Sequence, residues 1–110
     1  LMKETNHHNI RLYWQPPNGK DLNYCLSGLK AVINDVSNVH VFSWSFNSDN
    51  QIERRPLAEG KALWMEYFKE LRKKSADRYV MLEFVKDDSD QQFLADAATL
   101  REWVNNIIKG

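Results

Sequence analysis

Glu83 and His40 are the residues of this sequence best suited to chemistry. Glu83 stands in residues 79–85, a segment that is otherwise apolar, aromatic or β-branched and is typical of a strand covered on both faces. An unpaired buried carboxylate is costly, so it needs a cation, a metal or several hydrogen-bond donors beside it. His40 stands in a similar segment, residues 38–44. We therefore expect a histidine and a glutamate on two core strands to share one site.

Three successive strand–helix pairs are expected to position these residues. The strands are predicted over residues 10–15, 38–44 and 79–85, and the helices over residues 21–36, 58–74 and 91–108. Asp21 is a suitable N-cap for the first helix. A long polar loop is expected over residues 45–56. The apolar positions expected to face inward are Leu22, Cys25, Leu26, Leu29, Val32, Ile33, Val36, Leu63, Trp64, Tyr67, Phe68, Leu71, Phe93, Leu94, Ala97, Leu100, Val104, Ile107 and Ile108.

This alternation predicts an α/β fold in which parallel strands are joined by right-handed crossovers. Three parallel strands are too few to close a barrel, and an isolated sheet of this kind leaves two open edges. Ligand sites of α/β proteins lie at the carboxyl ends of such strands. His40 and Glu83 would belong to a ligand site there if both side chains pointed to the inner face.

The composition predicts one soluble domain over residues 1–110, with a polar lead-in over residues 1–9. The 110 residues include 15 acidic and 15 basic side chains, so no basic excess favours nucleic acid as a partner. Cys25 cannot form an internal disulfide and is expected in the core. No segment matches a membrane span or a signal peptide, which favours a cytoplasmic protein. The start at Leu1 suggests a piece of a longer protein or an engineered chain, and the adjacent His7 and His8 suggest a solvated loop.

The order of these segments resembles the C-terminal part of the xylose isomerase-like TIM barrels, the superfamily of sugar phosphate isomerases and epimerases. The resemblance covers most of the chain: residues 39–42 match the seventh barrel strand, and residues 80–85 match the eighth. A loop arginine, residues 56–60 and Trp64 follow the seventh strand in the same order. The resemblance implies three consecutive parallel strand–helix units of a partial (β/α)8 TIM barrel.

The resemblance also implies a site. His40 matches the family's histidine metal ligand, and Glu83 matches its last glutamate ligand, which in the epimerases also handles the proton next to the sugar carbonyl. A hard, oxygen-rich site of this type suits Mg²⁺ or Mn²⁺. Arg54 or Arg55, of which we favour Arg55, resembles the family's substrate-contacting arginine.

The first strand departs from the family pattern. The family usually has an aspartate there, whereas this chain has Tyr13, Trp14, Gln15 and Pro16. Gln15 could offer a carbonyl oxygen to the metal, and Trp14 could form an apolar wall against a sugar ring. Trp44 stands at a strand end in the same way, so for Trp14 and Trp44 both sugar stacking and a core position stay open. Trp64 and Trp103 lie on predicted helices and are expected to pack in the hydrophobic core.

Three hypotheses for function follow. The first is part of a metal-dependent sugar isomerase or epimerase that is inactive as an isolated fragment, with a sugar or sugar phosphate as partner. The second is a noncatalytic interaction module that self-associates through its open strand edges. The third is a phosphodiesterase of the endonuclease IV type, for which the required histidines and basic surface are not visible in the sequence.

Overall fold

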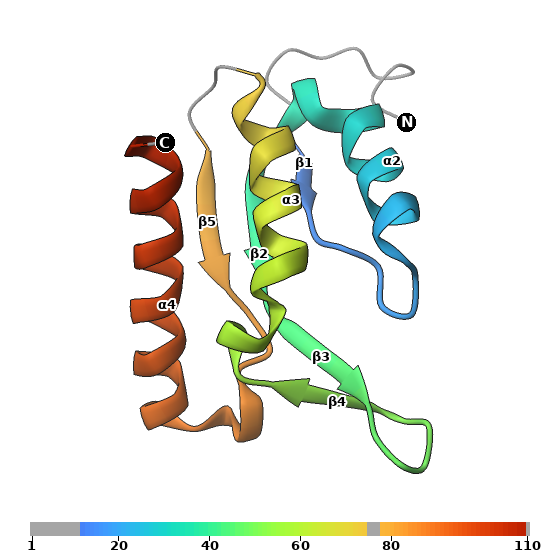
Figure 1. Ribbon diagram of the computed structural model, residues 1–110, viewed down its shortest axis with the longest axis vertical. Helices are drawn as coiled ribbons and strands as arrows, with labels where there is room; N and C mark the ends of the chain where they lie inside the picture. The colour runs from blue at the N-terminus through green and yellow to red at the C-terminus, as the bar shows by residue number, and fades with distance from the viewer. Residues whose placement is uncertain (1–11, 75–77, 110) are drawn as a thin grey trace.

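The computed structural model describes residues 12–74 and 78–109 of the chain (Figure 1). Strands and helices alternate along the sequence, with short 3₁₀ turns between several of them. The order is β1 (Leu12–Trp14), α2 (Leu22–Val32), η1 (Ile33–Asp35), β2 (Val36–Val41), β3 (Ser43–Phe46), β4 (Ile52–Arg55), η2 (Leu57–Gly60), α3 (Lys61–Arg72), β5 (Tyr79–Leu82), η3 (Lys86–Asp88) and α4 (Asp90–Lys109). The lead-in over residues 1–9, with His7 and His8, and the side chain of Ile108 lie outside the described residues.

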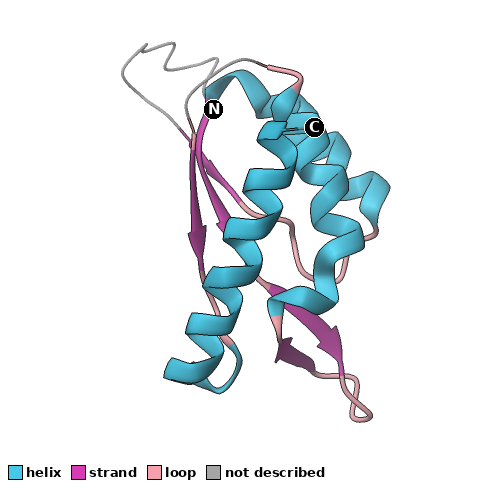
Figure 2. Ribbon diagram, turned by 60° about the vertical axis from the view of Figure 1, so that its left-hand side comes forward, coloured by secondary structure: helices cyan, strands magenta, loops and turns pink. Residues whose placement is uncertain are grey.

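The main sheet is parallel, with the strand order β1-β2-β5 and β2 in the centre. Its register pairs Tyr13 with Asn38 on one side and His40 with Met81 on the other. The helices α2, α3 and α4 all lie against one face of this sheet (Figure 2). The opposite face is not covered by any element of the described chain.

The expected fold class is wrong in its architecture. The chain is a small α/β domain, but it does not consist of three consecutive strand–helix units of a TIM barrel, because an antiparallel hairpin of β3 and β4 separates β2 from α3. This hairpin occupies most of the segment expected to be a loop. Its turn is held by the Asn47 carboxamide, whose Oδ1 accepts hydrogen bonds from the amides of Asp49 at 2.9 Å and Gln51 at 3.0 Å. Asn50 takes the left-handed conformation, with φ of 62°, that closes the turn.

The helical layer forms largely as its apolar spacing predicts, but α2 ends at Val32, and Val36, expected in this helix, begins β2. The carboxylate of Asp21 accepts a hydrogen bond from the Tyr24 amide at 2.8 Å, which confirms the predicted cap of α2. Cys25 is buried, also as predicted. The largest aromatic contacts join Trp14, Trp64 and Tyr67 edge to face, with centroid separations between 5.1 and 6.4 Å. The core that results contains Trp14, Cys25, Leu29, Val36, Val39, Val41, Leu57, Trp64, Tyr67, Phe68, Leu71, Leu100 and Trp103.

One buried and one half-buried polar side chain, Asp96 and Arg78, tie the layers together. The carboxylate of Asp96, which is only 4% exposed, accepts hydrogen bonds from the Leu57 amide at 3.0 Å and from Gln92 Nε2 at 2.7 Å. Asp96 thereby joins α4 to the start of η2. The guanidinium of Arg78 donates to four backbone carbonyls, on Ile33, Val36, Leu71 and Lys74, at 2.9–3.2 Å. Arg78 therefore holds the ends of α2 and α3 against the start of β2, and the sequence pattern did not predict this role.

Several expected core positions differ from the structure. Leu63, Phe93 and Leu94 were expected to face inward but are 47%, 49% and 68% exposed. The spacing of apolar residues predicted an inner stripe that includes these three residues. Only one side of α3 and of α4 lies against the sheet, so the buried surface of each helix is narrower than the predicted stripe. Within residues 12–74 and 78–109, no helix combines the length and apolar character needed to cross a membrane.

Candidate functional site

His40 and Glu83 meet on the uncovered face of the main sheet. His40 belongs to β2, and Glu83 directly follows β5, where its amide donates to the Val41 carbonyl at 3.0 Å and extends the ladder by one residue. Alternation along β2 turns Val39 and Val41 toward the helices, so His40 points the other way. The imidazole Nδ1 and the carboxylate Oε2 of Glu83 are 2.6 Å apart. The structure thus brings together the two residues singled out from the sequence.

Tyr13 completes the surroundings of this pair from β1. Its ring stacks on the imidazole of His40 with centroids 4.5 Å apart and planes inclined by 11°. The imidazole is thus fixed by a ring on one side and by a carboxylate at its edge, which limits its rotation. The side chains of His40 and Glu83 are 19% and 33% exposed, so a solute can reach the pair.

His40 and Glu83 each have a second polar atom in addition to the one that joins the pair. Within residues 12–74 and 78–109, no side chain or backbone group forms a hydrogen bond with His40 Nε2 or with Glu83 Oε1. A histidine that bonds a carboxylate through Nδ1 presents its other nitrogen in a defined direction. The same arrangement orients catalytic histidines and histidine metal ligands in many enzymes. The geometry therefore allows proton transfer at Glu83 Oε1 or at His40 Nε2.

The backbone next to Glu83 is strained. Phe84 adopts φ of 53°, in the left-handed region that a bulky side chain rarely occupies. The Phe84 ring packs edge-on against Phe42 at 5.3 Å, and the guanidinium of Arg54 lies 5.3 Å from its centroid. Arg54 also donates to Asp88 Oδ1 at 2.7 Å and to the Val85 carbonyl at 3.3 Å. Arg54, in the hairpin, therefore forms hydrogen bonds with both ends of the turn that follows Glu83, at Val85 and at Asp88.

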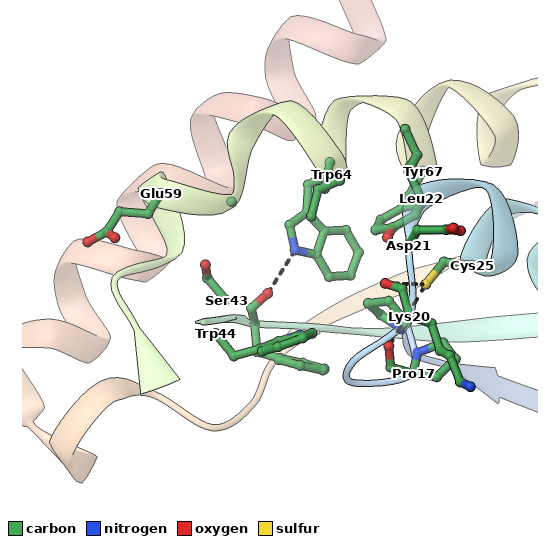
Figure 3. A pocket seen from close by; sticks show the side chains of 14 residues that line it. Pro17, Lys20, Asp21, Leu22, Cys25, Ser43, Trp44, Glu59, Trp64 and Tyr67 are labelled. Carbon is green, nitrogen blue, oxygen red and sulfur yellow. Dashed lines mark hydrogen bonds between the residues drawn. The ribbon is translucent and has the colours of Figure 1, made fainter. Parts of the chain in front are cut away.

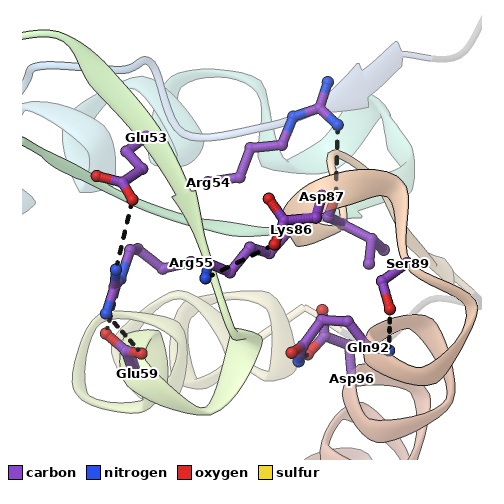
Figure 4. A network of polar contacts seen from close by, with 10 residues as sticks. Glu53, Arg54, Arg55, Glu59, Lys86, Asp87, Ser89, Gln92 and Asp96 are labelled. Atoms are coloured by element: carbon purple, nitrogen blue, oxygen red, sulfur yellow. Dashed lines mark hydrogen bonds and ion pairs between the residues drawn. The ribbon is translucent and has the colours of Figure 1, made fainter.

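Arg55, the arginine expected to contact substrate, is engaged within the hairpin and the following turn. Its Nε and one terminal nitrogen donate to the two carboxylate oxygens of Glu59 at 3.1 and 3.2 Å, and Glu53 lies 3.7 Å away (Figure 4). The hydrogen-bonded carboxylate of Glu59 raises the pKa of Arg55. Arg55 is therefore a fully charged group whose fork is already occupied by a carboxylate.

The other predicted contact residues do not gather around His40 and Glu83. Trp14 is 8% exposed and packs on Trp64 and Tyr67 among the helices. Gln15 is half-buried in the loop that follows β1. Trp44 lies in β3, where it packs edge-on against Phe46 at 5.2 Å. Trp44 instead lines a pocket on the helical side of the sheet, which is described below.

The residues that the structure describes do not form a complete metal site. Within residues 12–74 and 78–109, no group of three or more His, Cys, Asp or Glu side chains is placed to hold a metal ion. The two expected ligands, His40 and Glu83, are hydrogen-bonded to each other rather than converging on a common point. Mg²⁺ and Mn²⁺ favour about six mostly oxygen ligands, so the pair would need further ligands.

No protein family, curated protein or solved structure matches this chain. The evidence for a site at His40 and Glu83 is therefore the geometry of the chain itself.

Two contributors to the site were not predicted from the sequence. Tyr13 was noted only as part of an unusual strand, and its stacking on His40 depends on the β1–β2 register, which has an irregularity between Leu12 and Tyr13. Asp88, whose side chain is exposed, pairs with Arg54 across 34 residues of sequence. A cationic residue in the hairpin and an acidic cluster after the last strand were the available hints, but both are also common in solvated loops.

Proposed function

We propose that Glu83, positioned by His40, is the acid–base residue of an isomerase- or epimerase-type site that acts on a sugar or sugar phosphate. The proposal depends on one observation, the 2.6 Å contact between His40 Nδ1 and Glu83 Oε2 on an accessible sheet face. The class of substrate comes from the resemblance of the segments around these two residues to sugar isomerases and epimerases.

The proposed roles follow from the geometry. Glu83 Oε1 removes the proton from the hydroxyl-bearing carbon next to the sugar carbonyl and returns it on the same face to the former carbonyl carbon. The hydroxyl proton of the first carbon passes to the former carbonyl oxygen, so that ketose and aldose interconvert. Epimerisation would require a second proton donor on the opposite face of the sugar. His40 is a positioning residue, which holds the carboxylate through Oε2 and keeps Oε1 directed outward. Tyr13 fixes the imidazole in turn by stacking on it. No step in this proposal passes through a metal ion.

Binding at the pair can be tested without turnover, which we do not expect from the 110-residue chain alone. The probes are D-fructose, D-xylulose and their phosphates, and the measurement is the ¹H–¹³C signal of the His40 Cε1–H group. We expect a saturable shift with at least one ketose, and a much smaller shift in the E83A variant. A matched variant, E66A, removes an exposed carboxylate from α3 and should bind like the parent chain.

Two results would contradict the proposal. The first is the absence of any saturable shift at His40 with every ketose tested. The second is equal binding by the parent chain and E83A. Measurable ketose turnover by the purified chain would instead overturn the expectation that this chain is inactive alone.

The proposal includes a cytoplasmic location, which the composition and the single cysteine favour.

A second candidate function is self-association through the uncovered sheet. Tyr13, Tyr79 and Met81 are 62%, 72% and 42% exposed and lie on the sheet face opposite the helices. Parallel sheets are normally covered on both faces. The edge strands β1 and β5 also each have one side without a partner strand in the described chain. A second copy could cover this face, and the test is the oligomeric state considered in the Discussion.

A further inference from the structure

A pocket of about 260 Å³ lies at the carboxyl ends of β1 and β2, on the side of the sheet that the helices cover (Figure 3). Its walls come from the loop after β1, the start of α2, the start of the hairpin, and the first turns of η2 and α3. Residues of α2 and α3, such as Cys25 and Tyr67, line it. His40 and Glu83 lie on the opposite face of the sheet, so the pocket is a separate site.

Ser43 contributes a hydroxyl group to the wall of this pocket. It is only 8% exposed, and its hydroxyl points into the space between Glu59 and Trp64 (Figure 3). No group among residues 12–74 and 78–109 forms a hydrogen bond with Ser43 Oγ. Every fully buried side-chain nitrogen or oxygen of the described residues has a partner, so the unbonded Ser43 hydroxyl is not sealed inside the protein but reaches the solvent in the pocket. The Ser43 hydroxyl is therefore available to a ligand as both donor and acceptor.

Gly60 keeps this hydroxyl accessible. A Cβ atom at position 60 would lie 3.1 Å from Ser43 Oγ and 3.3 Å from Cδ1 of Trp64. Trp64 cannot easily move aside, because its Nε1 donates to the Phe42 carbonyl at 2.8 Å and its ring packs edge-on against Tyr67 at 5.1 Å. The wall around the hydroxyl is thus formed before any ligand binds.

The chemistry of the lining indicates the class of ligand. Trp44 and an edge of Trp64, which is 2% exposed, provide apolar surface beside the hydroxyl. The charged groups at the rim are of both signs, Lys20 with Asp21 and Glu59, and the two carboxylates already accept bonds from the Tyr24 amide and from Arg55. This mixture offers no cluster of cations for a phosphate. It suits a neutral ring with an apolar C–H face and hydroxyl groups at its edge.

We propose that this pocket is a noncatalytic binding site for a neutral monosaccharide, whose ring lies against Trp44 and Trp64 and whose hydroxyl bonds to Ser43 Oγ. The volume admits one sugar ring and no longer oligomer. The site is independent of the His40–Glu83 pair, because neither of these residues lines the pocket.

The indole N–H signals of Trp44 and Trp64 in ¹H–¹⁵N spectra provide the measurement. The probes are D-glucose, D-fructose and D-xylose, with adenosine and inorganic phosphate for comparison. We expect saturable shifts of both indoles with at least one sugar. Removing the hydroxyl in S43A should weaken binding about three- to tenfold, the range for one neutral hydrogen bond. G60A should weaken it further, because the added methyl group crowds Ser43 Oγ.

Controls separate this proposal from the acid–base one. H40A and E83A should bind the sugar at the pocket with unchanged affinity, whereas S43A should leave the His40 Cε1–H response to ketoses unchanged. S43A is a small change inside a formed wall, so its spectrum should stay that of the folded chain. The proposal is wrong if no sugar shifts the two indoles, if S43A binds as tightly as the parent chain, or if adenosine or phosphate binds at least as tightly as every sugar.

Discussion

Glu83 lies diagonally across the sheet from His40. The β2–β5 ladder pairs His40 with Met81, and Glu83 follows Met81 on the same face, where its carboxylate reaches the imidazole at 2.6 Å. Side chains in this diagonal relation interact only when at least one of them is long. Register, rather than nearness in sequence, therefore creates the pair, since 43 residues separate its members.

The first prediction concerns the energy of this pair. A double-mutant cycle of H40A and E83A at neutral pH should give a coupling of about 1 kcal/mol in the free energy of unfolding, as expected for a partly exposed hydrogen-bonded pair. Urea denaturation followed by circular dichroism provides the four values. A cycle of Lys69 and Glu66, an exposed pair on α3 at 3.3 Å, serves as the control and should couple less. A coupling near zero for His40 and Glu83 would show that the contact is not formed in solution.

The second prediction concerns Arg78. Burial lowers the pKa of its guanidinium, and no carboxylate offsets that cost, because all of its described partners are backbone carbonyls. R78M should therefore lower the free energy of unfolding by about 2–3 kcal/mol, since several carbonyls lose a charged donor at once. R101M, which removes an exposed arginine from α4, should change it by less than about 0.5 kcal/mol. Equal effects of the two substitutions in urea denaturation would contradict the role of Arg78 in holding α2 and α3 against β2.

The third prediction concerns acid stability. A hydrogen bond from Lys73 at 2.8 Å lowers the pKa of Glu70 from its ordinary value of 4.5, against the opposing effect of burial, and Lys30 at 3.7 Å adds to the lowering. Because the folded-state pKa is below the unfolded one, this contribution is present above about pH 4.5 and is lost as the pH falls through the folded pKa. E70Q should therefore be less stable than the parent chain at pH 7, and the difference should shrink below pH 4.5. An E70Q deficit that stays constant across this range would contradict the prediction.

The fourth prediction concerns self-association. If the uncovered sheet face pairs with a second copy, Y79E should shift the chain toward the monomer, because the charge would be buried in the interface. Y24E changes a tyrosine of similar exposure, 56% against 72%, on the helical side and should leave the association unchanged. Light scattering and sedimentation at micromolar concentration provide the masses. A monomeric mass for the parent chain, or equal effects of Y79E and Y24E, would rule out this face as the interface.

The sequence predicted the helical side of the fold well, for a physical reason. Apolar residues at intervals of three and four, with a cap such as Asp21, define a helix and its buried stripe without reference to the rest of the chain. The core positions of Trp64 and Trp103 followed from this periodicity, and both are buried. Leu63 and Leu94 were misplaced because periodicity does not say how much of a helix its neighbours cover.

The hairpin was missed because its residues look like a loop. Residues 45–56 are mostly polar, and only Phe46 and Ile52 add apolar character, each about half exposed. Strands on the periphery of a domain carry little of the alternation that identifies a half-buried strand. The site was predicted in part for a related reason: the residue types of His40 and Glu83 were informative, whereas Tyr13 and Arg54 depended on register and tertiary contacts.

The central place of β2 also determines when the site is completed as the chain is made. β1, α2 and β2 leave the ribosome before the other described elements, so they can pair before those are made. At that stage Tyr13 can lie beside His40, but the Glu83 carboxylate has not yet been made. Glu83 arrives only after the hairpin and α3, when β5 docks on the far side of β2. The contact between the two side chains therefore reports that the whole sheet has assembled, and a nascent chain that ends before β5 should lack it.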